Sequence, residues 1–96
     1  MSLKRITSHQ AKEKLSKPDT ILVDIRDEES FRNGHVEGAT HLTQESLPLF
    51  LNSVNKTAPI LVMCYHGNSS QMVASFLTEQ GFEDVYSIDG GYEGWV

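Results

Sequence analysis

The run Ile60-Leu61-Val62-Met63 constrains the fold of this chain more than any other stretch. It is branched, uncharged and bounded by Pro59, which is typical of a strand buried on both faces of a parallel sheet. Residues 71–80 behind it have apolar side chains at helical spacing, and Gly81 is placed to end that helix. We therefore expect a buried strand that turns sharply into an amphipathic helix.

The loop between these two elements is Cys64-Tyr65-His66-Gly67-Asn68-Ser69-Ser70, and it opens on the only cysteine of the chain. Its small, polar and glycine residues let the backbone curl and aim several N–H groups at the sulfur. Each such amide stabilises an ionised sulfur by roughly 1.5–3 kcal/mol, whereas the dipole of the following helix adds only about 0.3–1 kcal/mol. We expect an anion cradle that lowers the pKa of Cys64 chiefly through its amides. The alternative is an inert buried cysteine.

Strand-like and helix-like segments alternate along the whole chain. Strands are expected at Ile6, 20–25, 41–42, 60–63 and 84–88, and helices at 7–15, 27–31, 43–54, 71–80 and from Tyr92 onward. Helices between successive strands imply right-handed crossovers and a mostly parallel sheet. The predicted fold class is α/β, with about five strands and helices on both faces. Residues 1–96 are expected to form one domain, whose last helix is incomplete at Val96.

Three polar segments are expected at one rim of this sheet. Residues 24–26, Cys64 and residues 89–91 each follow a predicted strand. The carboxyl ends of parallel strands lie at the same edge, where ligands of such sheets collect. Within the first segment, we expect Asp24 and Arg26 to form an ion pair that supports the rim, with substrate binding as the alternative.

The charge distribution limits the partners and the way an anion is held. The net charge is −5, and all eight Lys and Arg residues lie in residues 1–56. An acidic chain without basic clusters is a poor nucleic-acid binder. An anion in the loop must be held mainly by amides, with help from His66, Arg26 or Arg32.

The compartment is predicted from the apolar runs and the cysteine count. No apolar run approaches a membrane span, so no membrane partner is expected. A lone cysteine cannot form an internal disulfide, and a reactive thiol is best kept reduced. We therefore expect a cytoplasmic protein.

Several separated motifs carry a family resemblance over nearly the whole chain. They are Val23-Asp24-Ile25-Arg26, Phe31, Gly34-His35-Val36-Glu37-Gly38-Ala39, the cysteine loop, and Asp89-Gly90-Gly91 with Trp95. On these residues the chain resembles the rhodanese domain family, and its loop is similar to that of the single-domain thiosulfate sulfurtransferases of the bacterial glycerol-3-phosphate regulon.

The resemblance implies a two-step sulfur transfer. The Cys64 thiolate takes the outer sulfur of thiosulfate as a persulfide while sulfite leaves, and the sulfur then passes to cyanide or a thiol. Thioredoxin is one candidate acceptor. The resemblance implies no metal and no organic cofactor.

The predicted site has three groups of residues. They are Cys64 as covalent carrier, the substrate-binding loop residues Tyr65, His66, Gly67, Asn68, Ser69 and Ser70, and the structural supports Asp24, Arg26 and His35. His66 faces either the anion or solvent, and Tyr65 either forms the pocket wall or packs. Ser69 and Ser70 are expected chiefly to cap the helix, with hydroxyls facing the sulfur as the alternative.

Two other functions are weighed against sulfur transfer from thiosulfate. A rhodanese-like cysteine phosphatase or arsenate reductase has an arginine six positions after the cysteine, and this chain has Ser70 there. Without that guanidinium, the loop is expected to bind phosphate esters weakly. A relay module that passes sulfur between proteins would use the same loop, so it stays open.

Overall fold

The computed structural model describes residues 4–95, which form one sheet of five parallel strands with helices between them. In chain order the elements are β1 (Arg5–Ile6), α1 (Ser8–Leu15), β2 (Ile21–Asp24), α2 (Glu28–Asn33), β3 (Thr40–His41), α3 (Leu47–Ser53), β4 (Ile60–Met63), α4 (Ser69–Glu79) and β5 (Val85–Ile88). The strand order is β1-β5-β4-β2-β3, and every neighbouring pair is parallel. The predicted α/β class and the five-stranded parallel sheet are confirmed.

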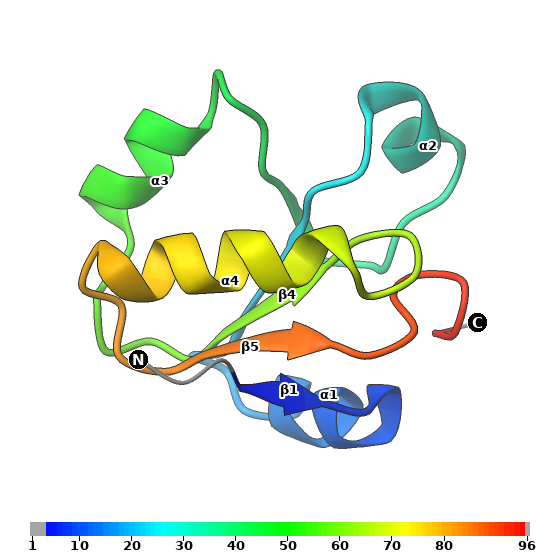
Figure 1. Cartoon of the computed structure of the whole chain (residues 1–96), viewed down its shortest axis with the longest axis horizontal. Coiled ribbons are helices and arrows are strands. Elements are labelled where there is room, and N and C mark those ends of the chain that lie inside the picture. Colours follow the sequence, from blue (N-terminus) through cyan, green and yellow to red (C-terminus); the bar gives the residue numbers. More distant parts are fainter. Residues whose placement is uncertain (1–3, 96) are drawn as a thin grey trace.

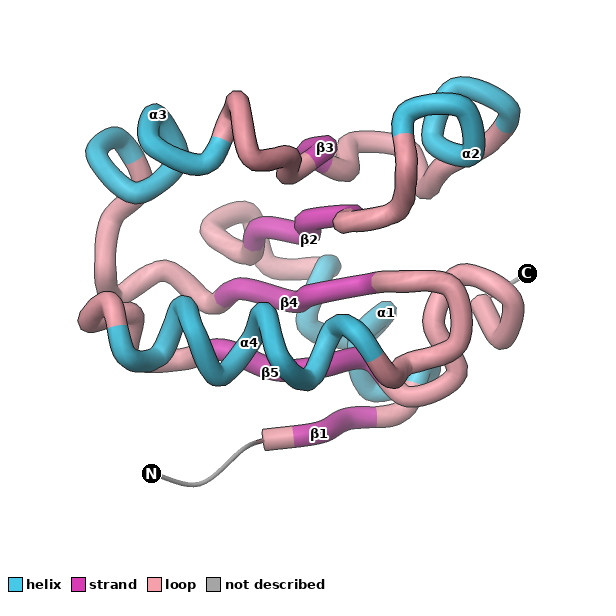
Figure 2. Tube along the Cα trace, turned by 45° about the horizontal axis from the view of Figure 1, so that its top comes forward, coloured by secondary structure: helices cyan, strands magenta, loops and turns pink. Residues whose placement is uncertain are grey.

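Helices cover both faces of the sheet. Figure 2 shows α4 on one side of β4 and β5, with α1 on the other. Successive residues of β4 point to opposite faces, because side chains alternate along a strand. Ile60 and Val62 pack in the core under α3 and α4, whereas Leu61 and Met63 pack in the core that includes Ala11 of α1. All four β4 residues are buried, as the uncharged run predicted.

Two predicted helices differ from the structure. The helix predicted from Thr43 begins only at Leu47, because Thr43 and Ser46 exchange side-chain hydrogen bonds: Thr43 N–H donates to Ser46 Oγ (2.9 Å) and Ser46 N–H donates to Thr43 Oγ1 (3.1 Å). This exchange forms a separate turn before α3. The helix predicted from Tyr92 is wrong for the described residues, which form turns up to Trp95. Val96 lies outside the described residues.

The carboxyl ends of β2, β4 and β5 meet at one rim, on the side where α4 begins (Figure 1). The Ile25 amide, just after β2, donates to the Met63 carbonyl at 2.9 Å. The Tyr92 amide, after β5, donates to the Cys64 carbonyl at 2.7 Å. The three polar segments therefore share one rim, as their positions after strands predicted.

A buried ion pair supports this rim. Arg26 Nη2 lies 2.8 Å from Asp24 Oδ2, and their side chains are only 5% and 0% exposed. The same nitrogen donates to the Gly34 carbonyl at 2.7 Å, and the guanidinium lies 4.0 Å from the centre of the Tyr92 ring. The hydrogen bond with Asp24 raises the pKa of Arg26. The predicted ion pair is confirmed, and it joins β2 to the loop after α2 and the turn after β5.

Arg26→Ala is expected to lower the free energy of unfolding by about 3–5 kcal/mol, because Asp24 would be left buried without a counter-charge. Urea unfolding followed by circular dichroism measures this change. Arg5→Ala is the matched control, since Arg5 pairs with Asp89 at the surface, with both side chains more than a third exposed, and should cost no more than about 1 kcal/mol. Equal losses in the two variants would contradict this account of the rim.

Candidate active site

The cysteine loop begins where β4 ends and closes where α4 begins. Cys64 follows Met63 directly and is only 2% exposed. The loop turns at Gly67, whose φ of +96° is unfavourable for residues with a Cβ. A Cβ at Gly67 would also lie 2.8 Å from the backbone nitrogen of Gly90. Both observations explain why a glycine stands at this turn.

Three hydrogen-bonding groups converge on the sulfur of Cys64. The amide of Gly67 donates to Sγ at 3.1 Å, and the amide of Ser70 donates to it at 3.3 Å. The Ser70 hydroxyl oxygen lies 3.4 Å from Sγ. The curled loop therefore points amides at the sulfur, which is the arrangement that the sequence predicted.

These contacts decide the direction of the Cys64 pKa. Burial raises the pKa, because it disfavours the charged thiolate. The hydrogen bonds from the Ser70 hydroxyl and from the amides of Ser70, Gly67 and His66 lower it, and together they outweigh burial. The net pKa of Cys64 is lowered, so the thiolate is favoured, as expected.

The loop is held in place by the turn that follows β5. In addition to the bond from Tyr92 to the Cys64 carbonyl, the Glu93 amide donates to the Tyr65 carbonyl at 3.1 Å. A Cβ at Gly91 would collide with the backbone of Cys64 and Tyr65. Glycine at position 91 thus permits the two backbones to approach this closely.

The other loop side chains lie away from the sulfur. His66, Asn68 and Ser69 are exposed, so the structure favours solvent over the anion for the His66 imidazole. The Tyr65 hydroxyl lies 3.2 Å from Ser30 Oγ and accepts from an α2 cap amide, which places the ring against α2.

The predicted capping role of Ser69 and Ser70 is wrong. Asn68 is the N-cap of α4, and no side chain makes a capping hydrogen bond there. Ser69 is exposed, whereas Ser70 is fully buried and faces the sulfur, which was the alternative. The reason is that the helix begins earlier than predicted, so both serines lie within its first turn.

Sequence reasoning missed Ser87, which is the second partner of the Ser70 hydroxyl. Ser87 lies in β5, is fully buried, and its Oγ is 2.7 Å from Ser70 Oγ. The sequence held one indication of it, which is a serine between Tyr86 and Ile88 in a strand expected to be buried. A buried hydroxyl requires a hydrogen-bond partner.

Comparison with known families agrees with this geometry. The Rhodanese-like domain family matches residues 7–96. The chain is a rhodanese-like domain.

Curated relatives of this rhodanese-like domain share most of its length. It is 57% identical over 91 residues to "Thiosulfate sulfurtransferase GlpE" of Tolumonas auensis, covering 95% of this chain and 86% of the relative. It is 51% identical over 92 residues to the protein of the same name in Pseudomonas putida, covering 96% and 84%. A rhodanese-like domain protein from Staphylococcus aureus superposes with a TM-score of 0.85 at 32% identity, covering 98% of this chain and 92% of that one.

Around the loop, α2 of the rhodanese-like domain is fixed by ring stacking. The Phe31 ring stacks on His35 with centroids 3.8 Å apart and on His41 with centroids 4.4 Å apart. His35 Nδ1 lies 2.7 Å from the Phe31 carbonyl oxygen, and His41 Nε2 lies 2.6 Å from the Arg26 carbonyl oxygen. His35 is thus hydrogen-bonded to the backbone of α2, as expected of a structural support.

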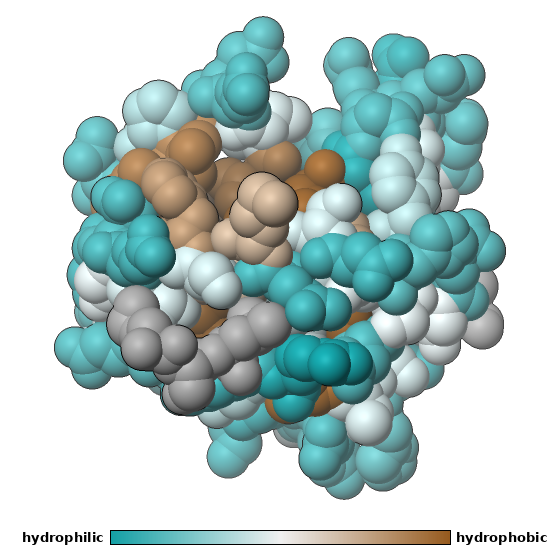
Figure 3. Space-filling view, viewed as in Figure 1, coloured by the Kyte–Doolittle hydropathy of each residue, from teal (hydrophilic) through white to brown (hydrophobic). Residues whose placement is uncertain are grey.

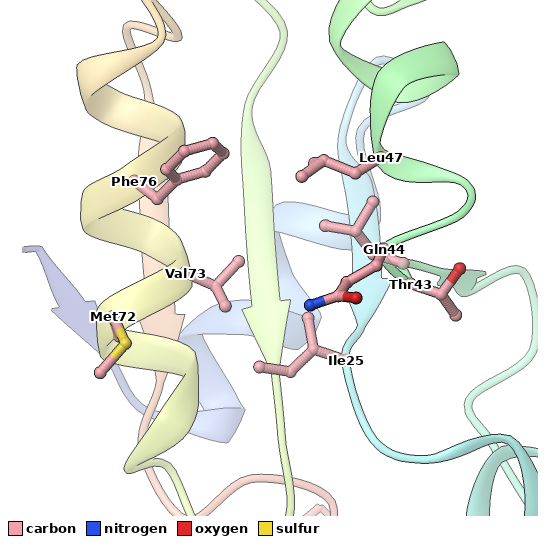
Figure 4. A pocket seen from close by; sticks show the side chains of 8 residues that line it. Ile25, Thr43, Gln44, Leu47, Met72, Val73 and Phe76 are labelled. Atoms are coloured by element: carbon pink, nitrogen blue, oxygen red, sulfur yellow. The ribbon is translucent and has the colours of Figure 1, made fainter.

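An apolar groove of about 460 Å³ lies between α3 and α4. Figure 3 shows the hydrophobic surface there, and Figure 4 shows side chains from α4, from the end of β2 and from the segment leading into α3 around it. Its lining is Ile25, Leu42, Thr43, Gln44, Leu47, Met72, Val73 and Phe76. None of these side chains is charged or carries a thiol, whereas the only cysteine of the chain lies in the cysteine loop.

Residues 4–95 contain neither a cluster of metal-ligating side chains nor a membrane-spanning helix. No three His, Cys, Asp or Glu side chains there are grouped to hold a metal ion. No helix in the same range is long and apolar enough to cross a membrane.

The rate of Cys64 alkylation by iodoacetamide is expected to rise with pH through an inflection below about 8.5, the ordinary pKa of a cysteine. Because the thiolate is the reacting form, a lowered pKa moves the whole curve toward lower pH. Alkylation rates measured from about pH 4 to about pH 10, on both sides of the ordinary cysteine pKa, locate the inflection. An inflection at or above the ordinary value would show that the hydrogen bonds do not outweigh burial.

Proposed function

We propose that this chain is a thiosulfate sulfurtransferase that carries sulfane sulfur as a persulfide on Cys64. The observation that carries the proposal is the convergence of two amides and one hydroxyl on the sulfur of the only cysteine. The names of the relatives described above support the substrate.

The first half-reaction forms the persulfide. The Cys64 thiolate attacks the outer sulfur of thiosulfate, a new S–S bond forms, and the S–S bond of thiosulfate breaks as sulfite leaves with the electron pair. The lowered pKa of Cys64 favours the thiolate that this attack requires. Hydrogen bonds from Gly67 and Ser70 then hold the inner sulfur while the outer one carries the charge.

The second half-reaction returns the thiolate. Cyanide or a thiol attacks the outer sulfur, and the bond to Cys64 breaks with the electron pair remaining on Sγ. Neither the amide of Asn68 nor that of Ser69 donates to an acceptor within residues 4–95, so both are free to stabilise the outer sulfur.

The remaining site residues are proposed as follows. His66 and Tyr65 belong to the substrate-binding loop, and Asp24, Arg26 and His35 are structural supports.

The residue six positions after the cysteine favours sulfur transfer over phosphate chemistry. Ser70 occupies that position, is fully buried, and contacts the sulfur through its amide and hydroxyl. A phosphoryl group would need a bidentate guanidinium there. Arg26 does not supply one, because its side chain is paired with Asp24 and Gly34.

The physiological acceptor is proposed to be a thiol, with thioredoxin as a candidate protein partner. A cycle that regenerates a thiolate needs a reducing compartment, so we propose the cytoplasm as its location. A relay in which another protein supplies the sulfur would use the same persulfide.

Incubation with thiosulfate is expected to add the mass of one sulfur atom to the intact protein, and cyanide is expected to remove it. Electrospray mass spectrometry measures both steps. Cys64→Ser should show no addition while keeping the wild-type circular dichroism spectrum, since a hydroxyl cannot form the persulfide. An unmodified wild-type protein, or an addition that persists in Cys64→Ser, would refute the proposal.

A further inference from the structure

Three buried side chains form a line from β5 to the reactive sulfur. Ser87 Oγ lies 2.7 Å from Ser70 Oγ, and Ser70 Oγ lies 3.4 Å from Cys64 Sγ. Ser87 and Ser70 are fully buried, and Cys64 is 2% exposed. The line runs from the sheet through the first turn of α4 to the cysteine loop.

Ser87 has no other visible reason to be polar. The preceding residue on its face of β5, Val85, belongs to the apolar core under α3 and α4. The Ser87 hydroxyl makes one hydrogen bond among residues 4–95, and that bond is with Ser70. A buried hydroxyl without a partner is costly, so a valine or alanine would serve packing better unless the bond to Ser70 has a role.

The thiol and the thiolate of Cys64 differ in the number of hydrogens available for the hydrogen bonds between these three side chains. The line has two links, one between the serines and one between Ser70 and Cys64. With a neutral thiol, three hydrogens compete for these two links, and one hydrogen is left over. With a thiolate, two hydrogens fill two links, because Ser87 donates to Ser70 and Ser70 donates to the sulfur. With a thiolate, therefore, both serine hydroxyl hydrogens are used and no hydrogen is left without an acceptor.

We propose that Ser87 is a positioning residue that donates a hydrogen bond to Ser70 Oγ and so keeps the Ser70 hydrogen directed at the anionic sulfur of Cys64. Without Ser87, the Ser70 hydroxyl is free to turn toward a backbone carbonyl three or four residues before it, in the cysteine loop, as serines on helices commonly do. The proposal deepens the proposed function, since it concerns the same sulfur. Its test by alkylation needs no sulfur transfer, so the two can fail separately.

The test compares the pH dependence of iodoacetamide alkylation in Ser87→Ala, Ser70→Ala, the double variant and wild type. Ser87→Ala is expected to raise the inflection by up to about one pH unit, which is up to about tenfold in rate below it. In the Ser70→Ala background, Ser87→Ala is expected to cause no further shift, because Ser87 acts through Ser70. Thr20→Val is the control, since it removes a buried hydroxyl that has no hydrogen-bond partner among residues 4–95. Thr20 lies just before β2, at the end of the sheet away from the cysteine loop.

A matched pair of equal size separates the hydroxyl from packing. Ser87→Thr keeps the donor and should retain the wild-type inflection, whereas Ser87→Val lacks it and should shift as Ser87→Ala does. An unchanged inflection in folded Ser87→Ala overturns the proposal. An equal shift by Ser87→Ala with and without Ser70 also overturns it, because that result indicates a general structural effect.

Discussion

The site depends on the close contact between the cysteine loop and the turn after β5. Two main-chain hydrogen bonds, from Tyr92 and Glu93, fix the carbonyls of Cys64 and Tyr65. Two glycines, Gly67 and Gly91, allow the backbones to lie this close. With its carbonyls held from outside, the loop keeps its amides directed inward at the sulfur. Parallel pairing of β4 with β5 brings both segments to one rim, so the sheet topology is a precondition of the chemistry.

The electrostatics of the loop rest on dipoles rather than on charged side chains. Residues 57–96 contain no Lys or Arg, and Arg26 at the rim is already paired with buried Asp24. Burial of Cys64 opposes ionisation, and the hydrogen bonds from Ser70, Gly67 and His66 overcome it. Such fixed donors require little reorganisation when negative charge moves from the cysteine sulfur to an outer sulfur. The absence of a nearby cation in this segment also suits a cycle in which the anion must leave again.

Much of the fold was predictable because most of the longer strands and helices have a strong local signal. The uncharged run before Cys64 and the glycine after α4 predicted a buried strand and a helix end, and the alternation of elements predicted the parallel sheet. The errors fall where short-range side-chain bonds decide, as at Thr43 and Ser46. The segment from Tyr92 instead forms turns, and the amides of Tyr92 and Glu93 donate to the carbonyls of Cys64 and Tyr65 in the cysteine loop.

The site was predictable up to the direction of individual side chains. The spacing of the loop predicted amides around the sulfur, but a shift of the start of α4 by two residues turned Ser70 from a cap into a contact of the sulfur. Ser87 is 17 residues from Ser70, and only the pairing of β5 beside β4 brings it near. Long-range contacts of this kind have no local pattern in a single sequence.

In the proposed cycle, the loop amides hold the anionic sulfur of Cys64 and of its persulfide. A crystal structure of the protein after treatment with thiosulfate would show where the added sulfur lies. The account predicts one extra sulfur atom bonded to Cys64 Sγ and within hydrogen-bond distance of the Asn68 and Ser69 amides, with the Gly67 and Ser70 amides still on the inner sulfur. An extra sulfur that points away from these amides, or a Cys64 that stays unmodified, would contradict it.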